Sequence, residues 1–199
     1  MYFCIINQGV MNAFNDFIFA AVDTLLRGGT LLYPTDTIWG IGCDATNYAA
    51  VEKLYSLKQR DHGKSMLVLC ADEEMVERYV APVGDSVREL LSAESPTTVI
   101  MPQMRGMLAS NLVASDGTIG VRIPRMDFCQ SMLASFGRPV VSTSANLSGC
   151  PSPSSFADID SAIVGGVEYC VPSSYDSGSA RSSRIVKLLP DGAVQVIRE

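Results

Sequence analysis

The sequence contains little histidine, with His62 the only one among 199 residues. A histidine-based catalytic triad and a histidine-rich metal site are therefore not expected. The six cysteines are scattered, and no two of them form a Cys-x-x-Cys pair. Zinc sites need clustered ligands, and disulfide frameworks belong to secreted chains. We therefore expect the cysteines to be buried small hydrophobic residues.

Long apolar runs and a targeting segment are also missing. No uninterrupted apolar stretch approaches the roughly 18 residues that cross a bilayer. The N-terminus lacks a basic region and a small-residue cleavage site, so we expect a cytoplasmic protein with no membrane partner. The net charge of −6 argues against a chain that coats nucleic acid over its whole surface, but it allows a local basic cleft. The chain also lacks a Walker-type phosphate-binding loop.

What the sequence does have is enough apolar residues for one sizeable core, at 47% hydrophobic and 18% charged. The length favours one domain over residues 1–199. Strands and helices alternate, which indicates an α/β fold with a mixed sheet. Helices are expected at 14–26, 47–60 (capped by Thr46 or Asn47), from 72, at 85–93, 127–136 and 156–164. Strands are expected at 30–33, 66–70, 97–101, 118–123 and 139–143, with a C-terminal hairpin at 184–189 and 193–197.

The first cluster with chemical potential is cationic. Lys58, Arg60 and Lys64 lie within seven residues at the end of a predicted helix. These cations either complement the helix dipole at a solvated helix end or form a phosphate clamp. His62, in the loop between them, is expected to be a loop residue and not a catalyst.

A second cluster follows the strand at 139–143. Ser142 to Gly149 form a hydroxyl-rich turn, and the carboxyl end of a strand is a usual ligand site in open α/β sheets. Serine and asparagine side chains, with backbone N–H groups, can cradle phosphate without adding charge. The alternative is an ordinary Asx or Ser turn that caps the next helix.

Two further segments combine a strand with polar residues and glycine. In Tyr33 to Gly42 a buried strand runs into a polar stretch, and the alternative is a turn whose Trp39 packs into the core. In the strand at 118–123, Thr118, Gly120 and Arg122 share one face because side chains alternate. This face leaves room for a ligand against the backbone, whereas the alternative is an edge strand with a solvated Arg122.

Four segments in order, YPTDTIWGIGCDA, LKQR, TIGVRIP and VVSTSANLSG, closely resemble the YrdC-like family, the threonylcarbamoyl-adenylate synthases of the TsaC type. The resemblance covers nearly the whole chain. It implies a single-domain α/β fold with a twisted open mixed sheet, flanking helices and an electropositive concave site. It also implies that L-threonine, bicarbonate and ATP condense to threonylcarbamoyl-adenylate and pyrophosphate. This product serves the threonylcarbamoyladenosine modification of tRNA, through a downstream threonylcarbamoyl-transferase complex.

The resemblance implies the roles of particular residues. The ATP-binding residues would be Lys58, Arg60, Lys64, Thr118, Ser144, Ser152 and Arg198. The threonine-binding residues would be Thr37, Arg122, Ser142 and Ser183, with Arg122 facing the carboxylate. The catalytic residues would be Lys58, Arg60, Ser144 and Asn146. Mg²⁺ is expected to accompany ATP without a metal cage in the chain.

The expected chemistry suits a chain with one histidine, because the carbamate oxygen is the nucleophile and no activated side chain is required. Direct binding of tRNA or other RNA is a further possible partner interaction. One alternative function is a non-enzymatic RNA-binding module that uses the same basic cleft, disfavoured by the few basic residues elsewhere. Another is a relative that adenylates a carbamoyl group or hydrolyses nucleotide with a different acceptor. Asp61 and Ser65-Met66 depart from the family's usual prolines, which predicts a differently shaped loop at 61–65.

Overall fold

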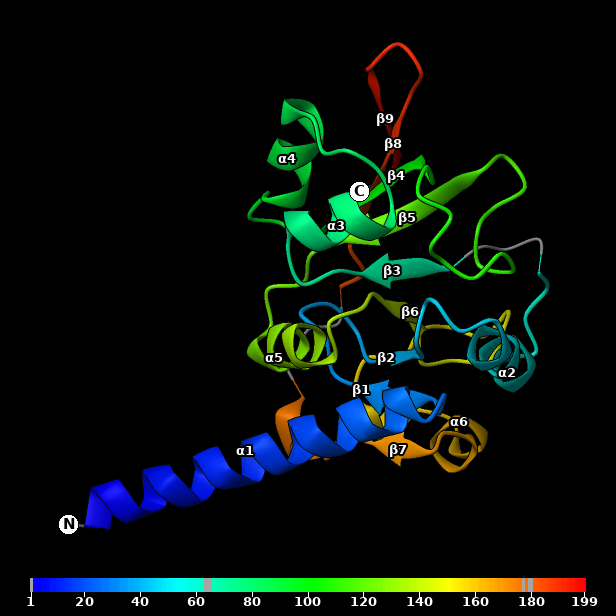
Figure 1. The fold of residues 1–199 in the computed structure, drawn as a ribbon. Helices are drawn as coiled ribbons and strands as arrows, with labels where there is room; N and C mark the ends of the chain where they lie inside the picture. The colour runs from blue at the N-terminus through cyan, green and yellow to red at the C-terminus, as the bar shows by residue number, and fades with distance from the viewer. Residues whose placement is uncertain (1, 63–65, 177, 179–180) are drawn as a thin grey trace.

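The computed structural model describes residues 2–62, 66–176, 178 and 181–199, and its strands form one mixed sheet (Figure 1). The strands of the described chain are ordered β7-β1-β2-β6-β3-β5-β4-β8-β9 across this sheet. The pairs β1–β7, β3–β5 and β4–β8 are parallel, and the other neighbours are antiparallel. The strands are β1 Leu31–Tyr33, β2 Gly40–Gly42, β3 Leu67–Leu69, β4 Thr97–Pro102, β5 Thr118–Arg122, β6 Val140–Ser144, β7 Tyr169–Cys170, β8 Arg184–Leu188 and β9 Val194–Arg198. The predicted α/β class with a mixed sheet is confirmed.

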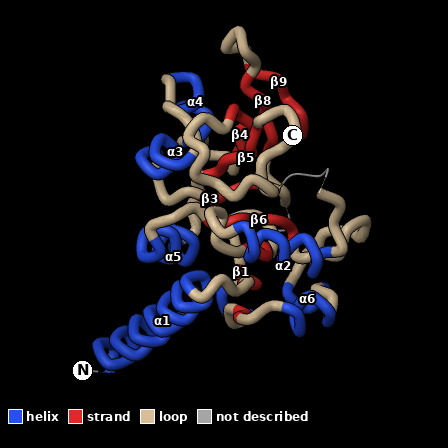
Figure 2. Tube along the Cα trace, turned by 45° about the vertical axis from the view of Figure 1, so that its right-hand side comes forward, coloured by secondary structure: helices blue, strands red, loops and turns tan. Residues whose placement is uncertain are grey.

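Helices flank this sheet. They are α1 Tyr2–Leu26, α2 Tyr48–Lys58, α3 Glu73–Tyr79, α4 Asp85–Leu91, α5 Asp127–Phe136 and α6 Ser161–Gly166, with short 3-10 turns at Phe156–Asp158 and Ser173–Tyr175. In Figures 1 and 2, α3, α4 and α5 stack along the same side of the molecule. Helix α2 lies against α6. No helix in the described part of the chain is long and apolar enough to span a membrane.

The residues that flank helix α2, which leads into the site, determine where it begins and ends. Helix α2 begins after Asn47, whose side chain accepts a hydrogen bond from the Ala50 N–H, as expected for an N-cap. It ends at Gln59, which adopts a left-handed conformation with φ of 50°. This conformation turns the chain sharply after Lys58, so the side chains of Lys58 and Arg60 lie in different surroundings.

Several details differ from the sequence expectations. Helix α1 begins at Tyr2 and not at Phe14. The helix expected at 156–164 is two separate pieces, because Ser155 and Asp158 form a capping box and Asp160 then caps α6 through the Ala162 N–H. Strands β2 and β7 are too short, at three and two residues, for their patterns to have indicated them.

The cysteines agree with expectation only in part. Cys43, Cys70 and Cys129 are buried, whereas Cys150 is exposed and Cys170 is half-buried. Burial raises the pKa of the three buried thiols, so they stay protonated and pack as small apolar groups. Cys150 is exposed because it follows the Ser142–Gly149 turn at the surface.

The buried core includes residues of the β1–β2 segment. Tyr33 and Ile41 are fully buried, and Trp39 is 2% exposed. The Trp39 ring packs edge-on against Phe156, with ring centroids 5.0 Å apart. Trp39 therefore packs into the core, as one interpretation of the Tyr33–Gly42 segment predicted, and it anchors the loop between β1 and β2. That loop carries Thr35, Asp36 and Thr37 to the site.

Candidate functional site

A cavity of about 620 Å³ opens over the sheet, and its lining includes residues of β5, β6, β8 and β9. Its lining comes from the β1–β2 loop, the end of α2, strands β4, β5 and β6, and the two C-terminal strands. The described lining residues include four cationic side chains, Arg60, Arg122, Lys187 and Arg198, and one carboxylate, Asp116. Such a lining favours a ligand with several negative charges.

Most of the site residues expected from the sequence gather at this cavity. The residues that line it are Thr37, Arg60, Thr118, Arg122, Ser142, Ser144, Ser152, Ser183 and Arg198. Lys58 and Asn146 do not line it, and the Lys58 ammonium donates to the Asn146 carbonyl oxygen. Lys64 falls outside the described residues, as does most of the loop expected to differ at 61–65.

The side-chain alternation of β5 holds as predicted. Thr118, Gly120 and Arg122 all face the cavity. Strand β5 lies between β3 and β4, so the alternative of an edge strand with a solvated arginine is wrong. Arg122 is 3% exposed. Gly120 is in a tight place, since an added Cβ would lie 3.2 Å from both Leu67 Cβ and Thr98 Cγ2.

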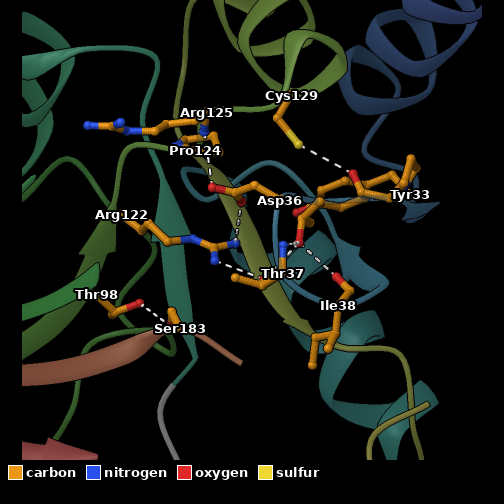
Figure 3. Close-up of polar contacts among 12 residues, drawn as sticks. Tyr33, Asp36, Thr37, Ile38, Thr98, Arg122, Pro124, Arg125, Cys129 and Ser183 are labelled. Atoms are coloured by element: carbon orange, nitrogen blue, oxygen red, sulfur yellow. Dashed lines mark hydrogen bonds and ion pairs between the residues drawn. The ribbon is translucent and has the colours of Figure 1, made fainter. Parts of the chain in front are cut away.

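The Arg122 guanidinium is held by the β1–β2 loop (Figure 3). Its Nη1 donates to Thr37 Oγ1 at 2.9 Å, and its Nη2 lies 3.5 Å from Asp36 Oδ1. The other Asp36 oxygen accepts the Arg125 N–H at 3.1 Å, which fixes the carboxylate. The Arg122 Nε–H is buried and has no partner among the described residues. A buried guanidinium with an unused donor is suited to an anionic group such as a carboxylate.

Ser183 connects two parts of the cavity wall. Its hydroxyl forms a buried hydrogen bond of 2.8 Å with Thr98 Oγ1, close to Arg122 in Figure 3. Its carbonyl oxygen accepts two hydrogen bonds from Arg198, at 3.1 Å from Nε and 2.7 Å from Nη2. Burial, together with the nearby Arg122 charge, lowers the pKa of Arg198. Two neighbouring cations that disfavour each other are stabilised when an anion binds between them.

Lys58 is buried and is not the solvated end of a helix. It is 1% exposed, and its Nζ donates to the carbonyl oxygens of Ser144 and Asn146, the latter at 2.8 Å. The Ser148 N–H donates to the Lys58 carbonyl at 2.9 Å. These bonds tie the end of α2 to the turn after β6. Burial, together with the nearby Arg60 charge, lowers the pKa of Lys58 to about 7.

The Asn146 side chain forms hydrogen bonds within the same turn, the one that follows β6. Its Nδ2 donates to the carbonyl oxygens of Leu147 at 2.9 Å and Cys150 at 2.7 Å. The turn is therefore braced by Lys58 on one side and by Asn146 on the other. This bracing leaves Ser144, at the end of β6, directed into the cavity.

Lys187 and Asp116 line the cavity but were not predicted from the sequence. The Lys187 ammonium lies 2.8 Å from Asp116 Oδ2, and Asp116 Oδ1 accepts from the Thr118 hydroxyl at 2.6 Å. These hydrogen bonds lower the pKa of Asp116 to about 2. Strand alternation is the sequence signal that could have indicated Lys187. Ile185, two residues earlier on β8, also lines the cavity, and alternate residues of a strand share a face.

His62 and possible metal ligands lie apart from this chemistry. His62 Nε2 lies 3.2 Å from Glu52, and its ring stacks on Tyr55 with centroids 4.5 Å apart. It does not line the cavity, in agreement with its expected role as a loop residue. Across the part of the chain that the structure describes, no three His, Cys, Asp or Glu side chains cluster to hold a metal ion.

Comparison with known proteins gives a consistent result. Residues 23–199 match the Sua5/YciO/YrdC family model, described as "Telomere recombination". The chain is 36% identical over 151 residues to a threonylcarbamoyl-AMP synthase of Chromohalobacter salexigens, which covers 74% of this chain and 80% of that protein. It is 31% identical over 183 residues to a threonylcarbamoyl-AMP synthase of Idiomarina loihiensis, which covers 90% of this chain and 96% of that one.

The fold is also similar to a solved structure, that of P. abyssi Sua5 complexed with L-threonine. The TM-score is 0.80 at 23% identity, over 91% of this chain and 53% of that chain. The present chain thus spans about half the length of that Sua5. The resemblance drawn from the four sequence segments is confirmed by a family model that covers almost the whole chain. On this ground the chain belongs to the Sua5/YciO/YrdC family.

Proposed function

We propose that this chain is an L-threonylcarbamoyl-adenylate synthase. It condenses L-threonine, bicarbonate and ATP to threonylcarbamoyl-adenylate and pyrophosphate, for the threonylcarbamoyladenosine modification of tRNA. The observation that carries the proposal is one cavity where a buried arginine with an unused donor, Arg122, faces the same space as Arg60 and Arg198. Two relatives named threonylcarbamoyl-AMP synthase, and a Sua5 structure complexed with L-threonine, support it.

The amino-acid end of the cavity centres on Arg122. Its guanidinium binds the threonine carboxylate, because charge-assisted hydrogen bonds from a planar donor fork suit a carboxylate. Thr37, Ser142 and Ser183 supply neutral hydroxyl groups around it. The contacts of Arg122 with Asp36 and Thr37 hold the guanidinium in place before substrate arrives, which reduces the entropic cost of binding.

ATP occupies the rest of the cavity. Its proposed direct partners are Arg60, Lys64, Thr118, Ser144, Ser152 and Arg198, whereas Lys58, expected in the same phosphate clamp, does not line the cavity. Arg60 lines the cavity, where its guanidinium would meet the phosphates directly. Lys58 and Asn146 act by bracing the turn that presents Ser144, which the contacts of Lys58 with two backbone carbonyls support. Lys187 adds a further cation at the same wall.

The reaction asks the chain for positioning and electrostatics. A carbamate of threonine reverts readily in water, so the cavity must hold it beside the α-phosphate and exclude solvent. The carbamate oxygen attacks the α-phosphorus, the bond to the bridging oxygen breaks, and pyrophosphate leaves with its charge offset by Arg60 and the other cations. No side chain needs to become a covalent nucleophile.

The residues present do not fit a protein-held Mg²⁺ site. Asp116 is the one carboxylate in the described cavity lining, and it is already paired with Lys187 and Thr118. Mg²⁺ needs several oxygen ligands, so any ion would enter bound to the ATP phosphates. Hand-over of the product to a transferase complex, direct RNA contact and a cytoplasmic location stay predictions of the sequence.

A substrate-omission assay tests the proposal. The purified protein is incubated with ATP, Mg²⁺, bicarbonate and threonine, and threonylcarbamoyl-adenylate and pyrophosphate are measured. We expect product only when every substrate is present, and a large loss in Arg122→Gln but not in the matched control Arg125→Gln. Arg125 is exposed and contacts Asp36 only through its backbone N–H. A folded protein that binds RNA but forms no product would refute the synthase and favour the RNA-binding module.

A further inference from the structure

Thr37, which lies beside Arg122 in Figure 3, is hydrogen-bonded to a second threonine, Thr35, and both residues line the cavity. Thr35 Oγ1 donates to the Ile38 carbonyl oxygen at 2.7 Å. A hydroxyl has one hydrogen, so Thr35 Oγ1 must accept in its 2.8 Å contact with Thr37 Oγ1. It also accepts the Thr37 N–H at 3.0 Å. Both side chains are almost fully buried.

The direction at Thr35 determines what Thr37 can offer to a ligand. The Thr37 hydrogen points toward Thr35, and one Thr37 lone pair accepts from Arg122 Nη1 at 2.9 Å. A hydroxyl oxygen has two lone pairs, so one remains on the side that lines the cavity. Thr37 therefore presents an acceptor, and only an acceptor, next to the donors of Arg122.

We infer that Thr35 is a positioning residue that fixes the Thr37 hydroxyl as a hydrogen-bond acceptor, so that the site selects a ligand with an N–H beside the carboxylate held by Arg122. This inference rests on the proposed function, because it specifies how the same cavity recognises an amino acid. Free threonine offers its amino N–H groups, and the carbamate still keeps one N–H. The contact with Thr37 is thus retained before and after the carbamate forms.

The Thr35→Val variant removes the hydroxyl with little change in shape. The Thr37 hydrogen is then free to turn into the cavity, and the Thr37 N–H loses its acceptor. We expect the KM for threonine to rise about 10-fold, while kcat and the KM for ATP stay within about 2-fold, as for the loss of one hydrogen bond. Thr35→Ser keeps the hydroxyl and should restore the wild-type KM.

Thr30→Val is the matched control. Thr30 is 2% exposed, and its hydroxyl donates to Glu168 Oε2 at 2.6 Å, away from the cavity. This variant should lose thermal stability without a change in either KM. Thermal unfolding of all three variants shows whether each is folded. A KM for threonine that is unchanged in folded Thr35→Val, or not restored in Thr35→Ser, would overturn the inference.

A binding comparison makes the inference independent of turnover. Calorimetry with L-threonine and with 3-hydroxybutanoate, which lacks the amino group, measures preference for the N–H donor. We expect wild type to prefer threonine by more than about 10-fold, and Thr35→Val to narrow this preference about 5-fold or more. An equal preference in the two proteins, or no threonine binding at all, overturns the inference. Threonine binding without product formation would instead refute only the proposed synthase reaction.

Discussion

Replacing Lys58 by methionine separates the two effects of a buried ammonium. Methionine keeps much of the length and removes the charge and the donors to Ser144 and Asn146. Each buried carbonyl left without its donor costs about 1–3 kcal/mol. Opposing this loss, a pKa lowered from 10.5 to about 7 by burial and by the Arg60 charge corresponds to a penalty of about 5 kcal/mol for the charged form. The two carbonyls together cost about 2–6 kcal/mol, so at pH 6 we expect the unfolding free energies of Lys58→Met and wild type to agree within about 3 kcal/mol.

The difference in unfolding free energy between wild type and Lys58→Met changes as the pH rises. Burial, and to a smaller extent Arg60, lowers the pKa of Lys58 in the folded chain. Between about pH 7 and 10.5 the unfolded chain binds a proton that the folded chain has released, so the free energy of unfolding rises with pH. Below pH 7 both states are protonated and the penalty is constant. From pH 6 to 10 wild type should gain about 4 kcal/mol relative to Lys58→Met, since pH 10 lies about three units above the folded pKa.

Urea unfolding followed by circular dichroism at pH 6, 8 and 10 measures this gain. The matched control is Lys53→Met, on the same helix but with a side chain 54% exposed, and its curve should run parallel to that of wild type. Activity at pH 8 should fall about 10-fold or more in Lys58→Met, since the turn that presents Ser144 loses its brace. Parallel pH curves for wild type and Lys58→Met would refute the lowered pKa of Lys58. An unchanged kcat/KM would refute its role as a brace of the turn after β6.

Three further predictions follow from single contacts. Arg122→Gln should raise the KM for threonine about 10- to 150-fold in steady-state kinetics, with little change in the KM for ATP. Equal changes in the two KM values would contradict a carboxylate site at Arg122. Lys187→Met should raise the pKa of Asp116 from about 2 toward its ordinary value, as an NMR titration would detect, and weaken ATP binding a few-fold; an unmoved titration speaks against the pair. Gly42→Ala should destabilise by about 2 kcal/mol or more in urea unfolding, because its Cβ would lie 1.9 Å from the Val141 carbonyl oxygen; unaltered stability is the contrary result.

Structural features that depend on residues close together in the chain were predictable from the sequence. Strand alternation placed Thr118, Gly120 and Arg122 on one face, and all three line the cavity. The cap of α2 was narrowed to two residues, of which Asn47 makes the bond. These features depend on neighbours within a few positions, so local physical chemistry decides them.

Features that depend on distant contacts were not predictable. Whether Lys58 is exposed or buried depends on the turn after β6, which follows it by more than eighty residues. The place of Lys187 depends on the parallel pairing of β8 with β4, and its partner Asp116 precedes a third strand. In the 156–164 segment the apolar spacing fitted one helix, but the caps at Ser155 and Asp160 divide it. Which of two such competing short-range signals prevails is decided only by the contacts of the folded chain.

The most direct test of the synthase assignment follows carbon from bicarbonate. The wild-type protein is supplied with ¹³C-bicarbonate, ATP, Mg²⁺ and L-threonine, and the adenylate product is analysed by mass spectrometry. We predict threonylcarbamoyl-adenylate that carries the ¹³C label, accompanied by an equal amount of pyrophosphate. Pyrophosphate release that does not require threonine, or an adenylate without the label, would contradict the assignment.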